Sequence, residues 1–223
     1  MTTINQFIKK MSKEQIDDKA IRVFSHYYSK LVAGETGLLP ENQIQPVARD
    51  TIDSFDNIHS TISQSHVKTL LSKTVCIKLN GGLGTTMGLQ GPKSLIPVKN
   101  GLTFLDITCR QIVAFNNNHD IQIPLLLMNS FRTESDSHKA MANYPELATS
   151  FPESFLQHKF PKVRASDFNP VEYPKDPEME WNPPGHGDIY IALETSGILD
   201  KLLQSDYRYA FISNIDNLGA TLD

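Results

Sequence analysis

The chain has 223 residues, of which 39% are hydrophobic and 21% are charged, so it can bury the core of one large domain and suits a soluble protein. Its 21 basic and 25 acidic residues give a formal net charge of −4, which argues against nucleic acid as a partner because nucleic-acid binding needs a basic excess or patch. No apolar run approaches the ~18 residues of a membrane span, so no membrane partner is expected either.

The first 70 residues are expected to form a helical segment. Apolar residues recur at helical spacing over residues 4–11 and again over residues 21–32, and Pro40 and Pro46 then indicate an extended connection. The amino terminus lacks the apolar stretch of a signal peptide, which predicts a cytoplasmic protein. Cys76 and Cys109 lie in apolar patterns and are therefore expected to be buried thiols rather than a disulfide.

Residues 71–223 alternate between strand and helix patterns. The predicted strands are residues 74–79, 124–128 and 207–212, with a weaker candidate at 151–157. Thr103 and Asp106 form the capping box of a helix, and further helices are expected at residues 135–143, 188–197 and 198–203. Residues 158–187 are proline-rich and read as irregular. The alternation predicts an α/β fold with a Rossmann-like, mostly parallel sheet.

Residues 75–94, VCIKLNGGLGTTMGLQGPKS, join a buried strand to a glycine-rich loop. Glycines follow the strand at positions 81, 82, 84, 88 and 91. They let the backbone bring its N–H groups close to an anion, and Lys93 adds a point charge suited to phosphate. We interpret the stretch as a nucleotide-phosphate loop. It is not a Walker loop, because no Gly-Lys-Ser/Thr sequence follows it.

The ends of the predicted strands supply further candidate residues. Open parallel sheets bind ligands beyond the carboxyl ends of their strands. The residues at these ends are 80–84, 128–129, 157 and 214–216. Among them, Asp216 is either a ligand of Mg²⁺ or the start of an Asx turn or helix, and the phosphate loop favours the metal.

The sequence WNPPGHGDIY places His186 between two glycines just before a helix. It is either an exposed histidine in a tight loop or a donor to a sugar-phosphate oxygen, and the residues alone leave both open. The other histidines show no HExxH spacing and no GxSxG sequence is present, so a zinc site and serine catalysis are not expected.

Four separated motifs together resemble the UTP–glucose-1-phosphate uridylyltransferase (UDP-glucose pyrophosphorylase) family, in its eukaryotic-type branch. The motifs are KLNGGLGTTMGLQGPKS, LLLMNSF, WNPPGHGDIY and FISNIDNLGATLD, which occur in the family's order across residues 74–223. Met87 stands where related sugar nucleotidyltransferases commonly carry arginine. The resemblance implies the sugar nucleotidyltransferase type of sheet, with residues 1–70 as an amino-terminal helical segment and 71–223 as part of the catalytic domain.

The resemblance also implies roles for individual residues. Those that it assigns to UTP are Leu79, Asn80, Gly81, Gly82, Lys93, Met128, Gln157 and Gly185. Those that it assigns to the sugar phosphate are Gly81, Gly82, His186, Asn214, Ile215 and Asp216. Met128 and Gln157 would line the uracil pocket and Lys93 would lie on the UTP phosphates. Asp216 would also hold Mg²⁺. The resemblance implies that Asp216 and Lys93 are the catalytic residues.

The implied reaction joins two small-molecule substrates, UTP and glucose 1-phosphate. A phosphate oxygen of glucose 1-phosphate attacks the α-phosphorus of UTP, and pyrophosphate leaves with Mg²⁺. No covalent enzyme intermediate is needed, so catalysis consists of positioning and charge stabilisation. The alternatives are uridylyl transfer to another sugar 1-phosphate, such as galactose 1-phosphate, and a non-catalytic UTP-binding fragment.

Members of the family continue through further strands, a second active-site lysine and a carboxyl-terminal β-rich domain, whereas this chain ends at Asp223. We therefore expect the amino-terminal part of the catalytic domain with an incomplete sheet. On this expectation the chain alone has less than normal turnover, and the unpaired edge of its sheet is a site of possible association.

Overall fold

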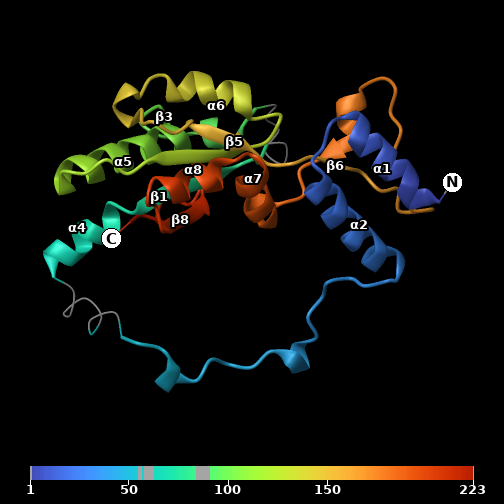
Figure 1. Cartoon of the computed structure of the whole chain (residues 1–223), viewed down its shortest axis with the longest axis horizontal. Coiled ribbons are helices and arrows are strands. Elements are labelled where there is room, and N and C mark those ends of the chain that lie inside the picture. The colour runs from blue at the N-terminus through green and yellow to red at the C-terminus, as the bar shows by residue number, and fades with distance from the viewer. Residues whose placement is uncertain (1, 55–56, 58–62, 84–90, 223) are drawn as a thin grey trace.

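The computed structural model describes residues 2–54, 57, 63–83 and 91–222 (Figure 1). Its central element is a four-stranded sheet in the order β5-β4-β1-β8, in which every neighbouring pair is parallel. The strands are β1 (Thr74–Asn80), β4 (Leu125–Asn129), β5 (Ser154–Leu156) and β8 (Tyr209–Asn214). The predicted α/β class with a parallel sheet is confirmed.

The two inner strands are buried on both faces. Every residue of β1 and of β4 is buried, as expected for central strands of a parallel sheet that helices cover on both sides. Because successive side chains point to opposite faces, Cys76 and Leu127 join one hydrophobic cluster while Ile77 and Leu126 join another. The core therefore consists of two apolar layers, one on each side of the sheet.

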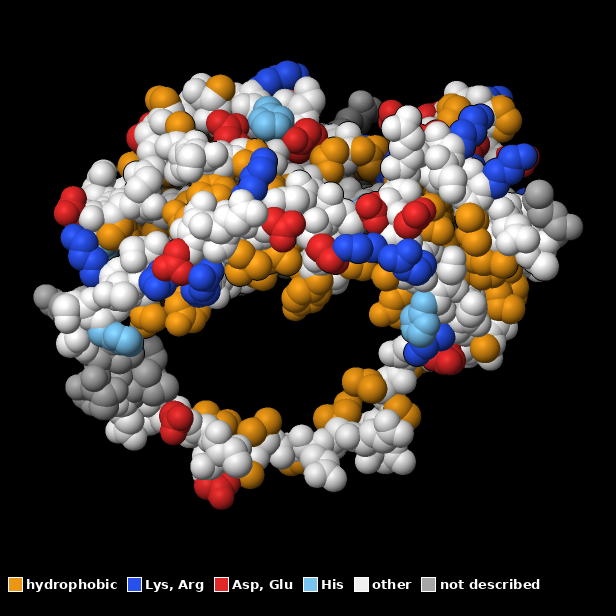
Figure 2. All heavy atoms as spheres, in the orientation of Figure 1, with side chains coloured by type: hydrophobic (Ala, Val, Ile, Leu, Met, Phe, Trp, Pro, Cys, Tyr) orange, Lys and Arg blue, Asp and Glu red, His pale blue; other side chains and the backbone are white. Residues whose placement is uncertain are grey.

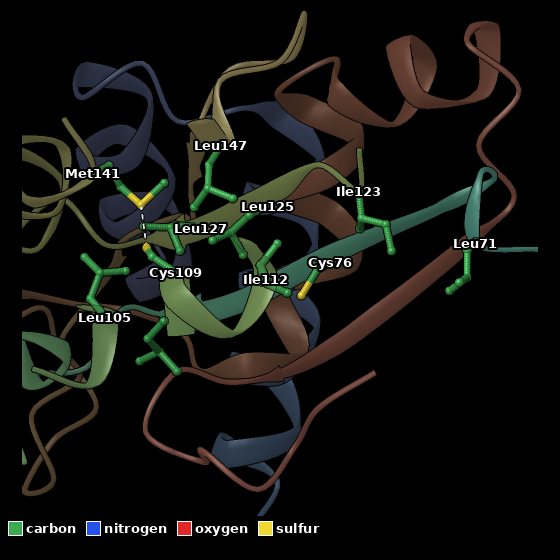
Figure 3. Close-up of a cluster of buried hydrophobic side chains, with 11 residues drawn as sticks. Leu71, Cys76, Leu105, Cys109, Ile112, Ile123, Leu125, Leu127, Met141 and Leu147 are labelled. Carbon is green, nitrogen blue, oxygen red and sulfur yellow. Dashed lines mark hydrogen bonds between the residues drawn. The ribbon is translucent and has the colours of Figure 1, made fainter. Parts of the chain in front are cut away.

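Helices from different parts of the chain cover the two faces. Figure 3 shows the first cluster, in which α5 (Phe104–His119) supplies Leu105, Cys109 and Ile112, and α6 (Glu134–Met141) supplies Met141. The second cluster lies under α7 (Ile189–Thr195) and α8 (Ile198–Gln204). The predicted capping box of α5 is present, since Thr103 and Asp106 each accept a hydrogen bond from the other's backbone N–H.

The amino-terminal helices α1 (Thr3–Lys13) and α2 (Asp18–Val32) pack on the proline-rich segment. Their third cluster holds Phe7, Phe24 and Tyr28 together with Trp181. Trp181 belongs to β7 (Trp181–Asn182), which pairs antiparallel with β6 (Phe160–Pro161). The segment that reads as irregular thus contains a short ladder that covers the two helices. The predicted domain boundary at residue 70 stays a prediction.

Residues 34–54 form an extended segment that leaves the body of the molecule (Figure 1, blue to cyan). It includes only two short 3-10 turns, Glu41–Gln43 and Arg49–Thr51. Its apolar side chains are exposed, as Figure 2 shows in orange; they are Leu38, Leu39, Ile44, Val47 and Ile52. The chain rejoins the body through α4 (Gln64–Leu71), whose Leu71 enters the first sheet cluster.

Three elements differ from the sequence expectation. The last strand lies two residues later than predicted, and the weak candidate strand begins only at Ser154, beyond Pro152. A hairpin of β2 (Pro97–Lys99) and β3 (Leu102–Thr103) was not expected. Its turn residues Asn100 and Gly101 both have positive φ. An Asn-Gly pair is a known sequence signal for such a hairpin turn. Within the described ranges, every helix is too short or too polar to cross a membrane.

Candidate active site

Seven of the residues expected at the site line one cavity of about 150 Å³. The lining consists of Leu79, Gly82, Lys93, His186, Asn214, Ile215 and Asp216. These residues come from the glycine loop, the GHGD sequence and the end of β8, which are far apart in the chain. They meet because parallel strands direct their carboxyl ends to the same edge of the sheet.

Lys93 and Asp216 form the charged centre of this cavity. Lys93 begins a 3-10 turn (Lys93–Leu95), and its backbone N–H donates to the carbonyl of Gly82 at 3.0 Å, which draws the two ends of the glycine loop together. Its ammonium contacts Asp216 Oδ2 at 2.6 Å. Both side chains are part-exposed, at 39% and 27%, so the pair contributes little to stability and its partners remain accessible to a ligand.

Asp216 lies in a turn after β8, and residues 216–220 do not form a helix. The helix N-cap alternative for this residue is therefore wrong. The turn closes with a hydrogen bond from the Asn217 N–H to the carbonyl of Asn214 at 3.2 Å. Asp216 is thus held at the cavity by strand and turn geometry, with its carboxylate directed at Lys93.

Gln157 follows β5 and lies directly over Gly81. The backbone N–H of Gln157 donates to the carbonyl of Asn129 at 2.8 Å, and its side chain is largely buried. A Cβ added at Gly81 would lie only 1.7 Å from Gln157 Nε2. Glycine at position 81 therefore serves a close approach between chain segments. The contact brings the residue expected to read uracil against the glycine loop.

Two expected ligand residues direct their side chains into the protein interior. Asn80 is 1% exposed, and its Nδ2 donates to Asn129 Oδ1 at 2.6 Å and to Ser137 Oγ at 2.8 Å. Met128 is fully buried in the second sheet cluster. Neither lines the cavity of about 150 Å³. The amide of Asn80 instead ties the end of β1 to β4 and α6.

The GHGD sequence forms a tight turn at the cavity. Gly185 has φ of 105°, a conformation open to glycine, and the 3-10 turn His186–Asp188 follows it. His186 lines the cavity, whereas the carboxylate of Asp188 points away and meets His158. Asp188 and His158 were not expected at the site. Glycines 84 and 88 of the loop and Met87 lie outside the described residues.

A buried lysine, Lys78, forms hydrogen bonds on both sides of the turn that carries Asp216. Lys78 in β1 is 3% exposed, and its ammonium donates to Ser213 Oγ at 2.7 Å and to the carbonyl of Ala220 at 2.9 Å. These two partners flank the turn that carries Asp216. Burial lowers the pKa of Lys78, against a smaller opposing effect of Cys76.

A larger cavity of about 770 Å³ lies between α2 and α7. Lys19, Arg22 and His26 line it from α2, and Gly187 and Asp188 border it from the far side of the GHGD turn. We place the candidate site in the smaller cavity, because that is where the strand ends, the lysine and the carboxylate meet.

Comparisons with known proteins show the family of this chain. The family model described as UTP–glucose-1-phosphate uridylyltransferase matches residues 21–223. A protein of that name from Pyrus pyrifolia is 41% identical over 215 residues, which cover 95% of this chain and 45% of the relative. UTP–glucose-1-phosphate uridylyltransferase 2 of Dictyostelium discoideum is 36% identical over 212 residues, with 95% and 42% covered.

Solved structures give the same result for the fold. UDP-glucose phosphorylase from Trypanosoma brucei is 43% identical with a TM-score of 0.90, covering 99% of this chain and 47% of that one. UDP-glucose pyrophosphorylase from Leishmania major is 38% identical with a TM-score of 0.89, covering 99% and 45%. The chain thus spans less than half the length of these relatives. Since the family model matches nearly all of the chain and the two solved structures share its fold, the chain belongs to the UTP–glucose-1-phosphate uridylyltransferase family.

Proposed function

We propose that the protein containing this chain forms UDP-glucose and pyrophosphate from UTP and glucose 1-phosphate. The observation that carries the proposal is the convergence of Lys93, His186 and Asp216 on one cavity at the carboxyl ends of parallel strands. A variant of the Leishmania major relative has been solved in complex with UDP-glucose, the product that this reaction would form.

The residues divide the work of binding between the two substrates. Gln157 lies over Gly81 and offers both a donor and an acceptor to the uracil edge. Lys93 would supply positive charge to the UTP phosphates, and His186 and Asn214, which line the same cavity, would contact the sugar phosphate. Leu79, Gly82 and Ile215 complete the lining and shape it.

The bond changes follow from an in-line displacement. An oxygen of glucose 1-phosphate forms a bond to the α-phosphorus of UTP, and the bond from that phosphorus to the pyrophosphate oxygen breaks. Among the described residues, those that line the cavity include no serine or cysteine nucleophile. It supplies positioning and positive charge, which are the main contributions that phosphoryl-type transfer requires from a protein.

The donor set fits Mg²⁺ bound largely through substrate. Mg²⁺ is usually held by one or two carboxylates together with substrate phosphates, and Asp216 supplies one part-exposed carboxylate. Among the described residues no group of three or more His, Cys, Asp or Glu side chains could form an all-protein cage. Asp216 would hold the ion, whose charge would offset that of the leaving pyrophosphate.

The proposal is tested by measuring pyrophosphate release from UTP plus glucose 1-phosphate. The assay uses the full-length natural protein that contains this chain. Asp216→Asn is expected to lower kcat by about a hundredfold or more and to weaken the Mg²⁺ dependence of UTP binding. Asp136→Asn, an exposed acid of α6 paired with Lys139, is the matched control and should retain full activity.

Three outcomes would contradict the proposal. A higher kcat/KM with galactose 1-phosphate or an N-acetylhexosamine 1-phosphate than with glucose 1-phosphate would show that glucose 1-phosphate is not the preferred substrate. UTP binding without pyrophosphate release would indicate a binding protein. Full activity of the Asp216→Asn variant would show that the Asp216 carboxylate is not needed for the reaction. The cytoplasmic location and the association through a sheet edge stay predictions.

A further inference from the structure

Asp188 is a nearly fully buried carboxylate that does not line the cavity of about 150 Å³. Its side chain is 2% exposed, and no lysine or arginine in the described part of the chain pairs with it. Both of its oxygens instead contact His158. The His158 backbone N–H donates to Oδ2 at 2.7 Å, and the ring Nδ1 lies 3.0 Å from Oδ1 and 3.1 Å from Oδ2.

This contact joins the two halves of the proposed site. His158 directly follows Gln157, the residue expected to read uracil, while Asp188 ends the turn that carries His186. The two partners are 30 positions apart in the chain. One carboxylate therefore fixes the nucleotide side of the site relative to the sugar-phosphate side.

The use of the carboxylate is not explained by local structure. Asp188 is the N-cap residue of α7, where an aspartate normally accepts a hydrogen bond from its own helix. Here its side chain makes no such bond and instead contacts His158, two residues beyond the end of β5. Burying a carboxylate is costly unless its partners are specific, so the gain must come from the connection that it makes.

The neighbouring Thr195 extends the contact without forming a nucleophilic triad. Thr195 Oγ1 lies 3.1 Å from His158 Nε2, so threonine, histidine and aspartate form a chain of successive contacts. The Thr195 hydroxyl, however, donates to the carbonyl of Ile191 at 2.9 Å. None of the three residues lines the cavity of about 150 Å³. The arrangement holds the His158 ring at both nitrogens.

We propose that Asp188 is a positioning residue that, through His158, keeps the uracil-reading and sugar-phosphate-binding segments in register. The inference rests on the proposed function, whose two substrates must meet in line. A misplacement of about 1 Å in such a site can cost on the order of a hundredfold in rate. Loss of the carboxylate should therefore affect both substrate selectivities at once, although Asp188 contacts neither substrate.

The test is Asp188→Asn in the full protein, with Asp136→Asn as the control. Asparagine keeps an acceptor for the His158 N–H but removes the charge and one acceptor toward Nδ1. We expect the KM for glucose 1-phosphate to rise about 10-fold or more and the preference for UTP over CTP to narrow about 10-fold. The melting temperature and the affinity for free pyrophosphate should stay near those of the wild type.

A double-mutant cycle with His158→Phe separates positioning from general damage. If Asp188 acts through His158, the double variant should lose no more than the worse single variant. Additive losses would overturn the inference, as would a folded Asp188→Asn protein with unchanged KM and UTP/CTP ratio. Should the wild type bind UTP but release no pyrophosphate, the proposed function fails separately. The UTP/CTP affinity ratio of Asp188→Asn, measured by calorimetry, then decides the inference.

Discussion

Adding one methyl group at Gly81 should damage uracil selection while leaving the fold intact. In Gly81→Ala the new Cβ would lie 1.7 Å from Gln157 Nε2 and 2.8 Å from its Cδ, whereas ordinary contact begins at 3.4 Å. The clash falls on the far end of a flexible side chain, so the Gln157 amide is displaced rather than the backbone. Gly81 does not have positive φ, so alanine adds no backbone strain there.

The magnitude follows from the hydrogen bonds that the displaced amide gives up. One neutral hydrogen bond contributes about 0.5–1.5 kcal/mol, so losing two costs about 1–3 kcal/mol. The preference for UTP over CTP, measured as a ratio of kcat/KM values, should therefore fall by a factor of about 5 to 150. The melting temperature should remain within a few degrees of the wild-type value, because the core is untouched.

Two variants make the reasoning refutable. Gly219→Ala adds the same methyl group where the nearest atom is Asn217 Oδ1 at 3.6 Å, and should change neither property. In a Gln157→Ala background, Gly81→Ala meets no amide and should have no further effect on the UTP/CTP ratio. An unchanged ratio in Gly81→Ala, or an undiminished effect without the glutamine, would show that Gln157 does not select the base.

Three further predictions concern charge and burial. Lys93→Ala should weaken UTP binding far more than uridine binding in calorimetry, since its ammonium is assigned to phosphate; equal losses would mark it as structural. Burial raises the pKa of Cys76 to about 11 and that of Cys109 to about 12, so neither thiol should react with a disulfide reagent near pH 8 until the chain unfolds; prompt reaction of the native protein would refute their burial. Burial works to lower the pKa of His138, but the hydrogen bond and charge of Glu134 outweigh it and raise the pKa above 6.5. The resulting stabilisation is full below pH 6.5 and is lost as the pH rises through the folded-state pKa, so His138→Gln should flatten the dependence of the melting temperature on pH above 6.5. If the melting temperatures of the wild type and of His138→Gln changed equally with pH, this prediction would be contradicted.

The sequence predicts the strands and the edge of the site better than it predicts which side chains face the ligand. Continuous apolar runs ending in glycine or asparagine locate β1 and β4, and the parallel-sheet rule then places Asn80 and Asp216 at one edge. Whether a side chain at that edge points into the cavity depends on its pleat position and on its neighbours. Asn80 finds two buried partners in Asn129 and Ser137, and so it faces inward.

Long-range pairs are what the sequence could not supply. Nothing local to residues 158 or 188 indicates that a histidine N–H and an aspartate 30 positions away will bond, because the pairing depends on how β5 and α7 pack. The contact between Gly81 and Gln157 is of the same kind. By contrast, the hairpin at Asn100 and Gly101 carried a readable local signal.

The pairing of Lys93 with Asp216 connects the two charges assigned to the reaction. Without substrate the ammonium and the carboxylate satisfy each other at 2.6 Å. On the proposed function, a UTP phosphate would approach Lys93 next to Asp216, and the carboxylate would then face phosphate oxygens of its own sign. Like charges at such distances repel unless a cation lies between them. If Lys93 binds UTP as proposed, Asp216 would therefore need a divalent cation between its carboxylate and the phosphates. Asp216 would hold that cation and Lys93 would contact the phosphates, so that each of the two charged side chains would face a group of opposite charge.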